Sequence, residues 1–287
     1  MKQFLFSFLM ICSLQLYAQI KIPADLSFST PFYEAENKYI VFSPRPEDQQ
    51  LMIGVAYIDP AAGYSYRYYG TITVEDGKLK LVPAQENTDM IARWQNLALK
   101  VAVLSEARVK EFELANPPEF LKFYKSNKPE KDFLVDKLSF QNGAGYSSLA
   151  LPKLEELRKE GFRSAKFYFE LSFAYNALQQ FSKAENAVNE AEKYNFHDEL
   201  MIKEMHYALL HQDKLIPAAD YLQKNFKNFQ SKLYKSEGIV NQVISFFNNN
   251  DMKNAGKWIK IYKSEIVEDQ YKTRIDDIEN KLKEGQK

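Results

Sequence analysis

Short runs of apolar residues, alternating with polar residues, fill the first half of the chain and are typical of β-strands. The clearest example surrounds Asp76-Gly77, a two-residue loop of the kind that closes tight hairpins. A turn at this dipeptide places apolar residues on one face of the hairpin and Thr and Lys residues on the other. The predicted cross-strand pairs are Val74 with Leu79 and Ile72 with Leu81.

The same signal recurs along residues 38–104 and predicts a sheet. Strand-like segments occupy residues 38–42, 51–58, 64–69, 71–74, 79–82, 90–95 and 97–104. Ser105 is placed to cap a short helix that ends near Phe112, and Asn116-Pro117 precedes a second helix that ends near Lys125. We therefore expect a small antiparallel sheet of five or six strands with short helices at its end, spanning residues 19–125.

Beyond residue 132 the periodicity changes from that of strands to that of helices. Residues 165–196 have the pattern of two helices joined by a tight turn, in which small and aromatic residues recur at fixed offsets. These residues are Tyr168, Leu171, Ser172, Tyr175, Phe181, Ala184, Val188 and Ala191. The segment resembles one tetratricopeptide repeat (TPR), in which a large residue, a Leu with a small residue, and a Tyr line the first helix and two spaced Ala residues line the second.

Neighbouring segments repeat this pattern. A step of about 34 residues, the length of this repeat, leads from Ala184 downstream to Ala218 and upstream to Ala150. A fourth copy is centred on Ala255 and needs three additional residues, which we expect in the loop at 228–231. The resemblance implies a TPR-like helical solenoid over residues 133–263, because helix pairs bury their apolar faces only by stacking. A linker at 126–132 precedes it, and an amphipathic capping helix at 264–287 closes it.

Some features depart from the repeat pattern. The small residue expected in the first helix is replaced by His206 in the third copy and by Val243 in the fourth. In the first copy, the Gly-containing stretch at 141–145 is expected to interrupt the first helix early. Pro152 is expected near the start of the second helix of that copy, where a missing N–H group is tolerated.

Residues 1–18 have the pattern of a cleavable signal peptide, with Lys2, an apolar run at 4–14, and Ala18 before the cleavage point. The apolar run is too short to span a bilayer as a helix. A lipoprotein would instead be acylated at Cys12, but Ile11 stands where that modification requires a small residue. We therefore expect export to the periplasm or the cell exterior, with no cysteine left in the mature chain for a disulfide.

Charge and motifs exclude several classes of function. The 38 basic residues balance the 38 acidic ones, which argues against nucleic acid or an anionic membrane surface as the main partner. The sequence contains no nucleophile elbow, phosphate loop or dinucleotide fingerprint. His206 and His211 do not share a helix face as a zinc pair would, and His206 is expected in the core. His197 is expected in a solvated turn. We therefore expect no enzyme activity, metal or cofactor.

The resemblance also implies a binding surface, because in this family the first helices of the repeats line a concave groove. The candidate groove residues in this chain are Phe169, Phe173, Asn176, Lys203, Tyr207, His211 and Phe247. Large aromatic residues beside one Lys and one Asn favour a peptide with apolar anchors. The alternative is that the first domain or the end helix covers this face.

A second candidate surface is a strand rich in tyrosine, in which Tyr64, Tyr66 and Tyr68 share one face. If exposed, these rings would stack on sugars, but we expect them to pack in the sheet. The sequence therefore predicts an exported, non-enzymatic scaffold that binds a protein or peptide partner in the cell envelope. The alternative is a carbohydrate-binding or enzyme-accessory protein that acts through the tyrosine-rich β-domain.

Overall fold

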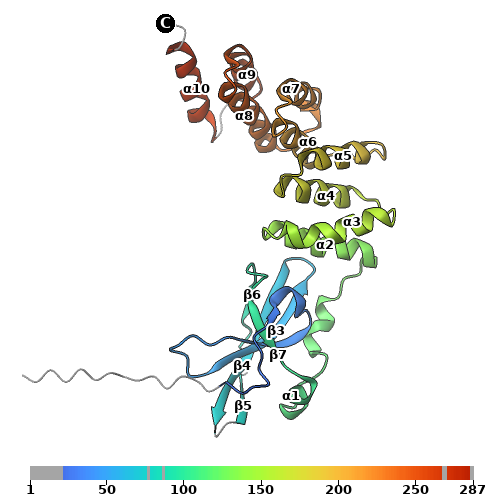
Figure 1. The fold of residues 1–287 in the computed structure, drawn as a ribbon, viewed down its shortest axis with the longest axis vertical. Helices are drawn as coiled ribbons and strands as arrows, with labels where there is room; N and C mark the ends of the chain where they lie inside the picture. The colour runs from blue at the N-terminus through green and yellow to red at the C-terminus, as the bar shows by residue number, and fades with distance from the viewer. Residues whose placement is uncertain (1–21, 76–77, 86–87, 267–269, 285–287) are drawn as a thin grey trace, which may run out of the picture. The chain divides into compact units, whose positions relative to one another are not determined.

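The computed structural model describes residues 22–75, 78–85, 88–266 and 270–284. The chain divides into two compact units, Met1–Ser126 and Asn127–Lys287. The first contains an antiparallel sheet and the second contains only helices, so the predicted α+β arrangement of two domains is confirmed (Figure 1). The predicted signal peptide at 1–18, with Cys12, lies outside the described residues.

The sheet of the first unit has seven strands in the described residues, in the order β1-β7-β2-β3-β4-β5, with β6 paired to β4. All pairs are antiparallel. The strands are β1 (Thr30–Pro31), β2 (Lys38–Phe42), β3 (Leu51–Asp59), β4 (Gly63–Glu75), β5 (Lys78–Pro83), β6 (Ile91–Arg93) and β7 (Lys100–Val103). The two strands predicted at 64–69 and 71–74 form the single long strand β4, which pairs with β3 on one edge and with β5 and β6 on the other.

The hairpin at Asp76-Gly77 has the predicted register, although the dipeptide itself is outside the described residues. Val74 is opposite Leu79 and Ile72 is opposite Leu81. Ile72 and Leu79 are buried, and they join a core formed by β2, β3, β7 and the short helices that follow. The apolar pattern therefore fixes which face of this hairpin is covered.

The short helices of the first unit also follow the sequence signals. Helix α1 (Glu106–Glu111) begins after Ser105, whose hydroxyl accepts a hydrogen bond from the Arg108 N–H. The segment after the proline pair forms a 3-10 helix, η2 (Glu119–Tyr124), and another 3-10 turn, η1 (Phe32–Glu34), follows β1. Tyr64 and Tyr66 are buried, which confirms the expected packing of these rings within the sheet.

In the residues that the structure describes, the second unit has four antiparallel helix pairs and a final helix. The first helices of the pairs are α2 (Glu130–Gly143), α4 (Ala165–Ala177), α6 (Glu199–Leu210) and α8 (Lys232–Asn248). The second helices are α3 (Ser147–Lys159), α5 (Phe181–Glu192), α7 (Leu215–Lys224) and α9 (Met252–Glu265), with the 3-10 turn η3 (Phe226–Asn228) after α7 and α10 (Lys272–Glu284) at the end. Each first helix contacts its own partner and the first helix of the next pair, so the pairs form a continuous stack.

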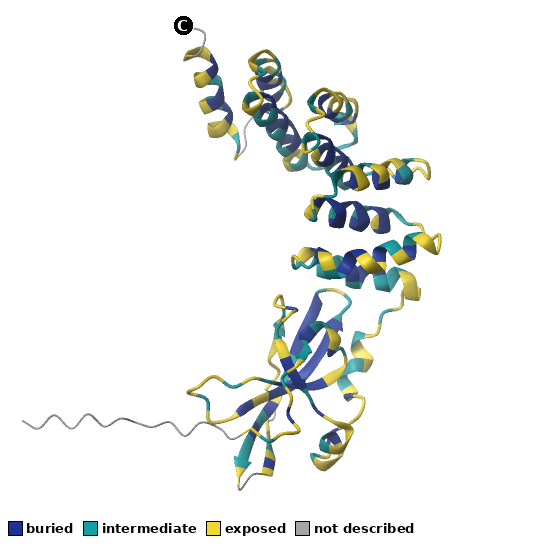
Figure 2. Ribbon diagram, in the orientation of Figure 1, coloured by how far each residue is buried: buried dark blue, intermediate teal, exposed yellow. Residues whose placement is uncertain are grey.

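Burial along the stack follows the repeat. Figure 2 shows α4 largely buried, whereas α10 has one buried and one exposed face. The side chains of Ala150, Ala184, Ala218 and Ala255 are all fully buried, as the predicted series requires. The helix predicted at 264–287 is shorter than expected, because α9 extends to Glu265 and α10 begins only at Lys272.

The turn inside each helix pair has the same backbone conformation. Gly145, Gln179, Asp213 and Asn250 occupy equivalent positions, and each has a positive φ angle. In each turn the next residue donates its N–H to a carbonyl five residues earlier, as in Gln180 N to Tyr175 O, which is the bonding of a Schellman cap. The stretch at 141–145 is therefore the regular turn of the first pair, and the expected early interruption of its first helix is wrong: α2 runs to Gly143.

Three other details differ from the sequence prediction. Helix α2 begins at Glu130, inside the segment expected to be a linker. Pro152 lies in the interior of α3, beyond the first turn. The extra residues of the fourth copy lengthen α8 at its start. Relative to the equivalent residues Ile239 and Ile202, α8 begins a full turn earlier than α6. A helix accepts an insertion at its free end without disturbing the stack.

Replacement of Ala184 by Trp tests the register of the stack. Because Ala184 is fully buried between helices, the larger side chain should overpack the contact and lower the free energy of unfolding by about 2 kcal/mol. Thermal melting followed by circular dichroism measures the change. Ala177→Trp is the control, because Ala177 lies at the exposed end of α4. Equal melting temperatures for the wild type and Ala184→Trp would contradict the register.

Candidate functional site

Two surfaces of the helical stack bring functional side chains together. The first is the exposed side of the first helices, where Phe173 on α4 and Tyr207 on α6 occupy equivalent positions. Tyr207 is 43% exposed, and its ring lies 4.2 Å from that of His211. The His211 ring stacks on Phe181, with 4.9 Å between centroids. We call Phe181, Tyr207 and His211 the aromatic patch. Tyr207 and His211 are exposed and Phe181 is partly buried, so the patch presents aromatic surface to the solvent.

The predicted phenylalanines flank this patch without joining it. Phe169 and Phe173 on α4 lie 6.1 Å apart and are both partly buried, and Phe169 also packs on the main core. Phe247 on α8 is partly buried against the second core, around Trp258. Phe173 therefore extends the aromatic surface along the stack, whereas Phe169 and Phe247 serve mainly to pack it.

The two polar candidates are occupied by contacts within the protein. Asn176 is buried, and its amide donates to the Glu204 backbone carbonyl at 3.0 Å and to Glu204 Oε2 at 2.7 Å. Lys203 Nζ lies 2.8 Å from Glu237 Oε2 and 4.0 Å from the centroid of the Tyr234 ring. These side chains hold neighbouring helices together, so the structure does not support their expected role in orienting a ligand.

The contact of Asn176 belongs to a repeated polar ladder. Asn142, at the equivalent position of α2, donates to the backbone carbonyl of Glu170 and to its carboxylate in the same way. Both amide oxygens, Asn142 Oδ1 and Asn176 Oδ1, are buried without a hydrogen-bond partner. Between α6 and α8 a different pair of side chains makes the contact. Nε2 of the buried His206 lies 2.9 Å from Gln242 Oε1. Burial lowers the pKa of His206 to about 4, which makes it the neutral core histidine that was expected.

The carboxyl groups of this ladder have strongly different environments. Burial raises the pKa of Glu170. Burial also raises the pKa of Glu204, to about 7, although the hydrogen bond from Asn176 lowers it. At the equivalent position of α2, Lys128 and Lys166 overcome the effect of burial and lower the pKa of Asp136. The stack thus contains a carboxyl group that changes its charge near neutral pH.

The second surface is a cleft of about 720 Å³ on the side of the second helices, lined by α5, α6, α7 and η3. Its volume falls in the range of about 300–1,000 Å³ that is usual for ligand sites. Met205 and Leu209 contribute apolar surface, and Lys224 and Lys227 contribute positive charge. We call it the outer cleft.

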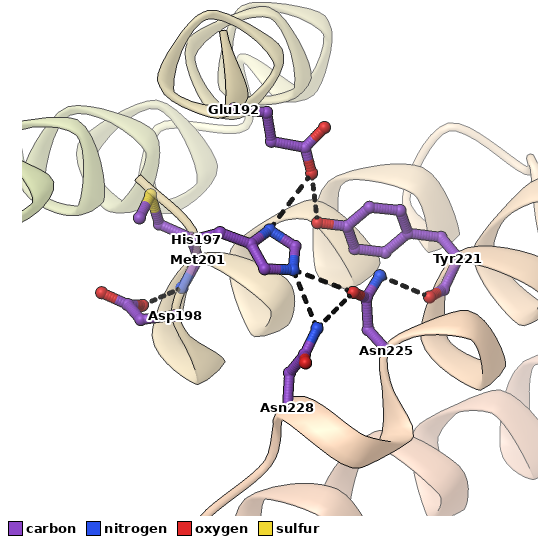
Figure 3. A network of polar contacts seen from close by, with 7 residues as sticks. All are labelled: Glu192, His197, Asp198, Met201, Tyr221, Asn225 and Asn228. Atoms are coloured by element: carbon purple, nitrogen blue, oxygen red, sulfur yellow. Dashed lines mark hydrogen bonds and ion pairs between the residues drawn. The ribbon is translucent and has the colours of Figure 1, made fainter. Parts of the chain in front are cut away.

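A polar network crosses the outer cleft and is shown in Figure 3. Tyr221 on α7 donates its hydroxyl to Glu192 Oε1 on α5 at 2.9 Å. His197, in the turn before α6, points its Nδ1 toward the same oxygen at 3.7 Å. On the other side of the ring, Nε2 lies 3.0 Å from Asn225 Oδ1 and 2.9 Å from Asn228 Nδ2.

The network fixes the position of the His197 ring. Asn228 Nδ2 donates to Asn225 Oδ1, and Asn225 in turn donates to the Tyr221 carbonyl. His197 Nε2 lies next to both Asn225 Oδ1, an acceptor, and Asn228 Nδ2, a donor, so these contacts are compatible with either tautomer of the ring. His197 lies exposed in the turn between α5 and α6, as expected, and its ring also contacts Glu192, Asn225 and Asn228. Local sequence gives no sign of this, because Asn225 and Asn228 lie in the next helix pair.

Among the described residues, no group of three or more His, Cys, Asp or Glu side chains is arranged to hold a metal ion. No described helix has the length and apolar character needed to cross a bilayer. Burial raises the pKa of Tyr221, so its hydroxyl remains a hydrogen-bond donor to Glu192.

The sheet unit contains a smaller apolar pocket of about 320 Å³. Phe42, Tyr66 and Trp94 form its aromatic wall, with centroid separations of 4.8 Å for Phe42 and Tyr66 and 4.9 Å for Phe42 and Trp94. Exposed Met52 and Met90 also line it. The tyrosine strand thus contributes one ring to a pocket and does not form the exposed stacking row of the alternative hypothesis.

Comparison of the chain with protein-family models, with curated proteins and with solved structures found no match. The two surfaces of the helical stack and the pocket of the sheet unit are the features of the chain that bear on its function.

Proposed function

We propose that the protein is an exported, non-enzymatic scaffold whose helical unit, an array of tetratricopeptide type, binds a protein or peptide partner in the cell envelope. The observation that carries the proposal is the aromatic patch, in which Tyr207 is 43% exposed beside His211 and Phe181. A few aromatic anchors dominate the affinity of many protein interfaces.

The form of the stack supports the same proposal. Four helix pairs with equivalent turns present their first helices side by side, so the position of Tyr207 on α6 is repeated on α4 by Phe173, which flanks the patch. An amphipathic helix laid along such a row would place apolar residues on successive rings. Export is part of the proposal and rests on the sequence pattern of residues 1–18 alone.

Truncation of the anchors tests the proposal. Peptides are first selected from a displayed random library on the immobilised wild-type protein, and their affinities are then measured by fluorescence anisotropy. Phe173→Ala and Tyr207→Ala should each weaken binding by about 2 kcal/mol, because each removes an aromatic anchor. Ile216→Ala is the matched control, since Ile216 on α7 is 50% exposed and lies outside the patch. Unchanged affinities in both variants, with normal circular dichroism, would refute the proposal.

A second candidate function is supported by the pocket in the sheet unit. Its apolar wall of Phe42, Tyr66 and Trp94 suits the face of a sugar ring or another flat ligand. This would make the protein a carbohydrate-binding or enzyme-accessory protein. A glycan array probed with the wild type and with Trp94→Ala distinguishes the two functions. Sugar binding through the pocket would depend on Trp94 and would not involve the aromatic patch.

A further inference from the structure

The outer cleft is separate from the aromatic patch and has its own charge. Lys224 and Lys227 are exposed at its edge, and within the described residues neither makes an ion pair. The acid groups of the cleft are already engaged. Glu185 is neutralised by Lys214, at 2.7 Å, and Glu192 accepts one hydrogen bond from Tyr221 and faces His197. Two lysines therefore remain available for an anion.

The cleft also has an apolar part. Its lining includes the partly exposed ring of Tyr221 on α7, together with Met205 and Leu209 on α6, which are only 3% and 6% exposed. The hydroxyl of Tyr221 is fixed on Glu192, which holds its ring in place across the cleft (Figure 3). An apolar side chain of a ligand would contact this surface and leave the water.

Amide side chains complete the lining. Asn189 projects from α5, and Asn228 belongs to η3. Asn228 is held in position by His197 and Asn225. The Nδ2 group of Asn228 is taken by His197 and Asn225, so Asn228 offers only its Oδ1 acceptor, whereas the amide of Asn189 carries both the donor and the acceptor that pair with a peptide group. Positioning by a fixed network lowers the entropic cost of binding.

We propose that the outer cleft binds an extended peptide segment in which an acidic side chain stands next to an apolar one. The acidic group would lie at Lys224 and Lys227, the apolar side chain on the Tyr221 ring with Met205 and Leu209, and the backbone against the asparagines. The balanced charge of the chain, with 38 basic and 38 acidic residues, favours such a local contact over a polyanion such as nucleic acid. The inference rests on the outer cleft alone and does not depend on the aromatic patch.

The test uses the full chain and fluorescein-labelled, amide-capped pentapeptides. The first probe has the sequence Gly-Glu-Leu-Glu-Gly, the second replaces both Glu with Gln, and the third replaces Leu with Gly. Anisotropy should show binding of the first probe at least about tenfold tighter than binding of the other two. Equal binding of all three probes, or no binding of the first, would overturn the proposal.

Two sets of variants assign the binding to the cleft. The double variant K224Q/K227Q should weaken binding of the first probe about tenfold, because it removes both charge-assisted contacts. K232Q is the matched control, with the same chemical change at an exposed lysine on α8, and should leave the affinity unchanged. Tyr207→Ala should also leave it unchanged, which separates this site from the proposed function. Equal losses in K232Q and K224Q/K227Q would contradict the assignment.

Inorganic phosphate provides the final arm of the test. If phosphate at low millimolar concentration displaces the first probe and the Leu-to-Gly probe binds equally well, the cleft is a simple anion site and the peptide proposal is wrong. If the first probe stays bound when phosphate is added at constant ionic strength, the apolar contact with Met205 and Leu209 contributes to the affinity as proposed.

Discussion

Replacement of Gly54 by Ala should destabilise the sheet unit by about 3 kcal/mol, because the added methyl group has no room. A Cβ atom at this position would lie 2.3 Å from the Arg67 backbone oxygen and 2.3 Å from Cε2 of the Tyr66 ring. The backbone oxygen belongs to β4, which pairs with β3 at this point, where the register shifts. Relief of the contact therefore requires a movement of the strand, and the Tyr66 ring would leave the wall of the apolar pocket.

Fluorescence makes this effect measurable in the whole chain. The chain has two tryptophans, Trp94 in the sheet unit and Trp258 in the helical unit. In a Trp258→Phe background, urea unfolding of the wild type and of Gly54→Ala reports on the sheet unit. Gly256→Ala is the control, since a Cβ atom there meets nothing within 4 Å and Ala favours the helix α9. A Gly54→Ala protein as stable as the wild type would mean that the strands do not approach as closely as described.

Replacement of Glu204 by Gln should make the helical unit more stable at pH 8 by about 2–3 kcal/mol. Burial raises the pKa of Glu204 from 4.5 to about 7 in the folded protein. The folded state binds the proton more tightly than the unfolded state. The free energy of unfolding therefore falls as the pH rises from 4.5 to about 7. Below pH 4.5 both states are protonated and the penalty disappears. Gln removes the charge and keeps an oxygen that accepts the hydrogen bond of Asn176.

The measurement is urea unfolding of the helical unit from pH 4 to pH 8, followed by Trp258 in a Trp94→Phe background. The difference between Glu204→Gln and the wild type should be small at pH 4 and should reach its full value near pH 8. Asp277→Asn is the control, because Asp277 is an exposed residue of α10. A difference that stays constant across this range would show that the charge of Glu204 is not the cause.

Local patterns in the sequence predict much of this fold, and for identifiable reasons. The pairing around Asp76-Gly77 follows from alternation, because only one register buries Ile72 and Leu79 together. The buried Ala series follows from the close approach of helices, which leaves no room for a larger side chain. By contrast, β1 has only two residues and is formed by pairing with β7, so no local pattern marks it.

The turns between helices show where glycine alone is a poor guide. Gly145 occupies the left-handed position in the first pair, but Gln179, Asp213 and Asn250 occupy it in the others. A glycine among helix-forming residues was expected to break α2, whereas the same backbone geometry recurs without glycine. The repeat spacing identifies the turn, since these four residues are equivalent along the stack.

The candidate binding surfaces depend on contacts between side chains, and the periodicity of the sequence does not show which partner each side chain contacts. Tyr207 and His211 lie on the predicted face and are exposed, but Asn176 and Lys203 on the same face are taken by Glu204 and Glu237. Helical periodicity gives the direction of a side chain and not its partner. The outer cleft was missed because it joins α5, α6, α7 and η3, from two helix pairs, around His197, which looks like an ordinary turn residue.

The most direct test of the central claim is site-specific photo-crosslinking of the aromatic patch in the cells that make the protein. A benzophenone amino acid replaces Tyr207 in one strain and Ile216, an equally exposed residue outside the patch, in another. If the patch binds a protein partner, irradiation should give a discrete crosslinked product from position 207 and none from position 216. No product at position 207, or the same products from both positions, would contradict the claim that this face of the helical unit binds a partner.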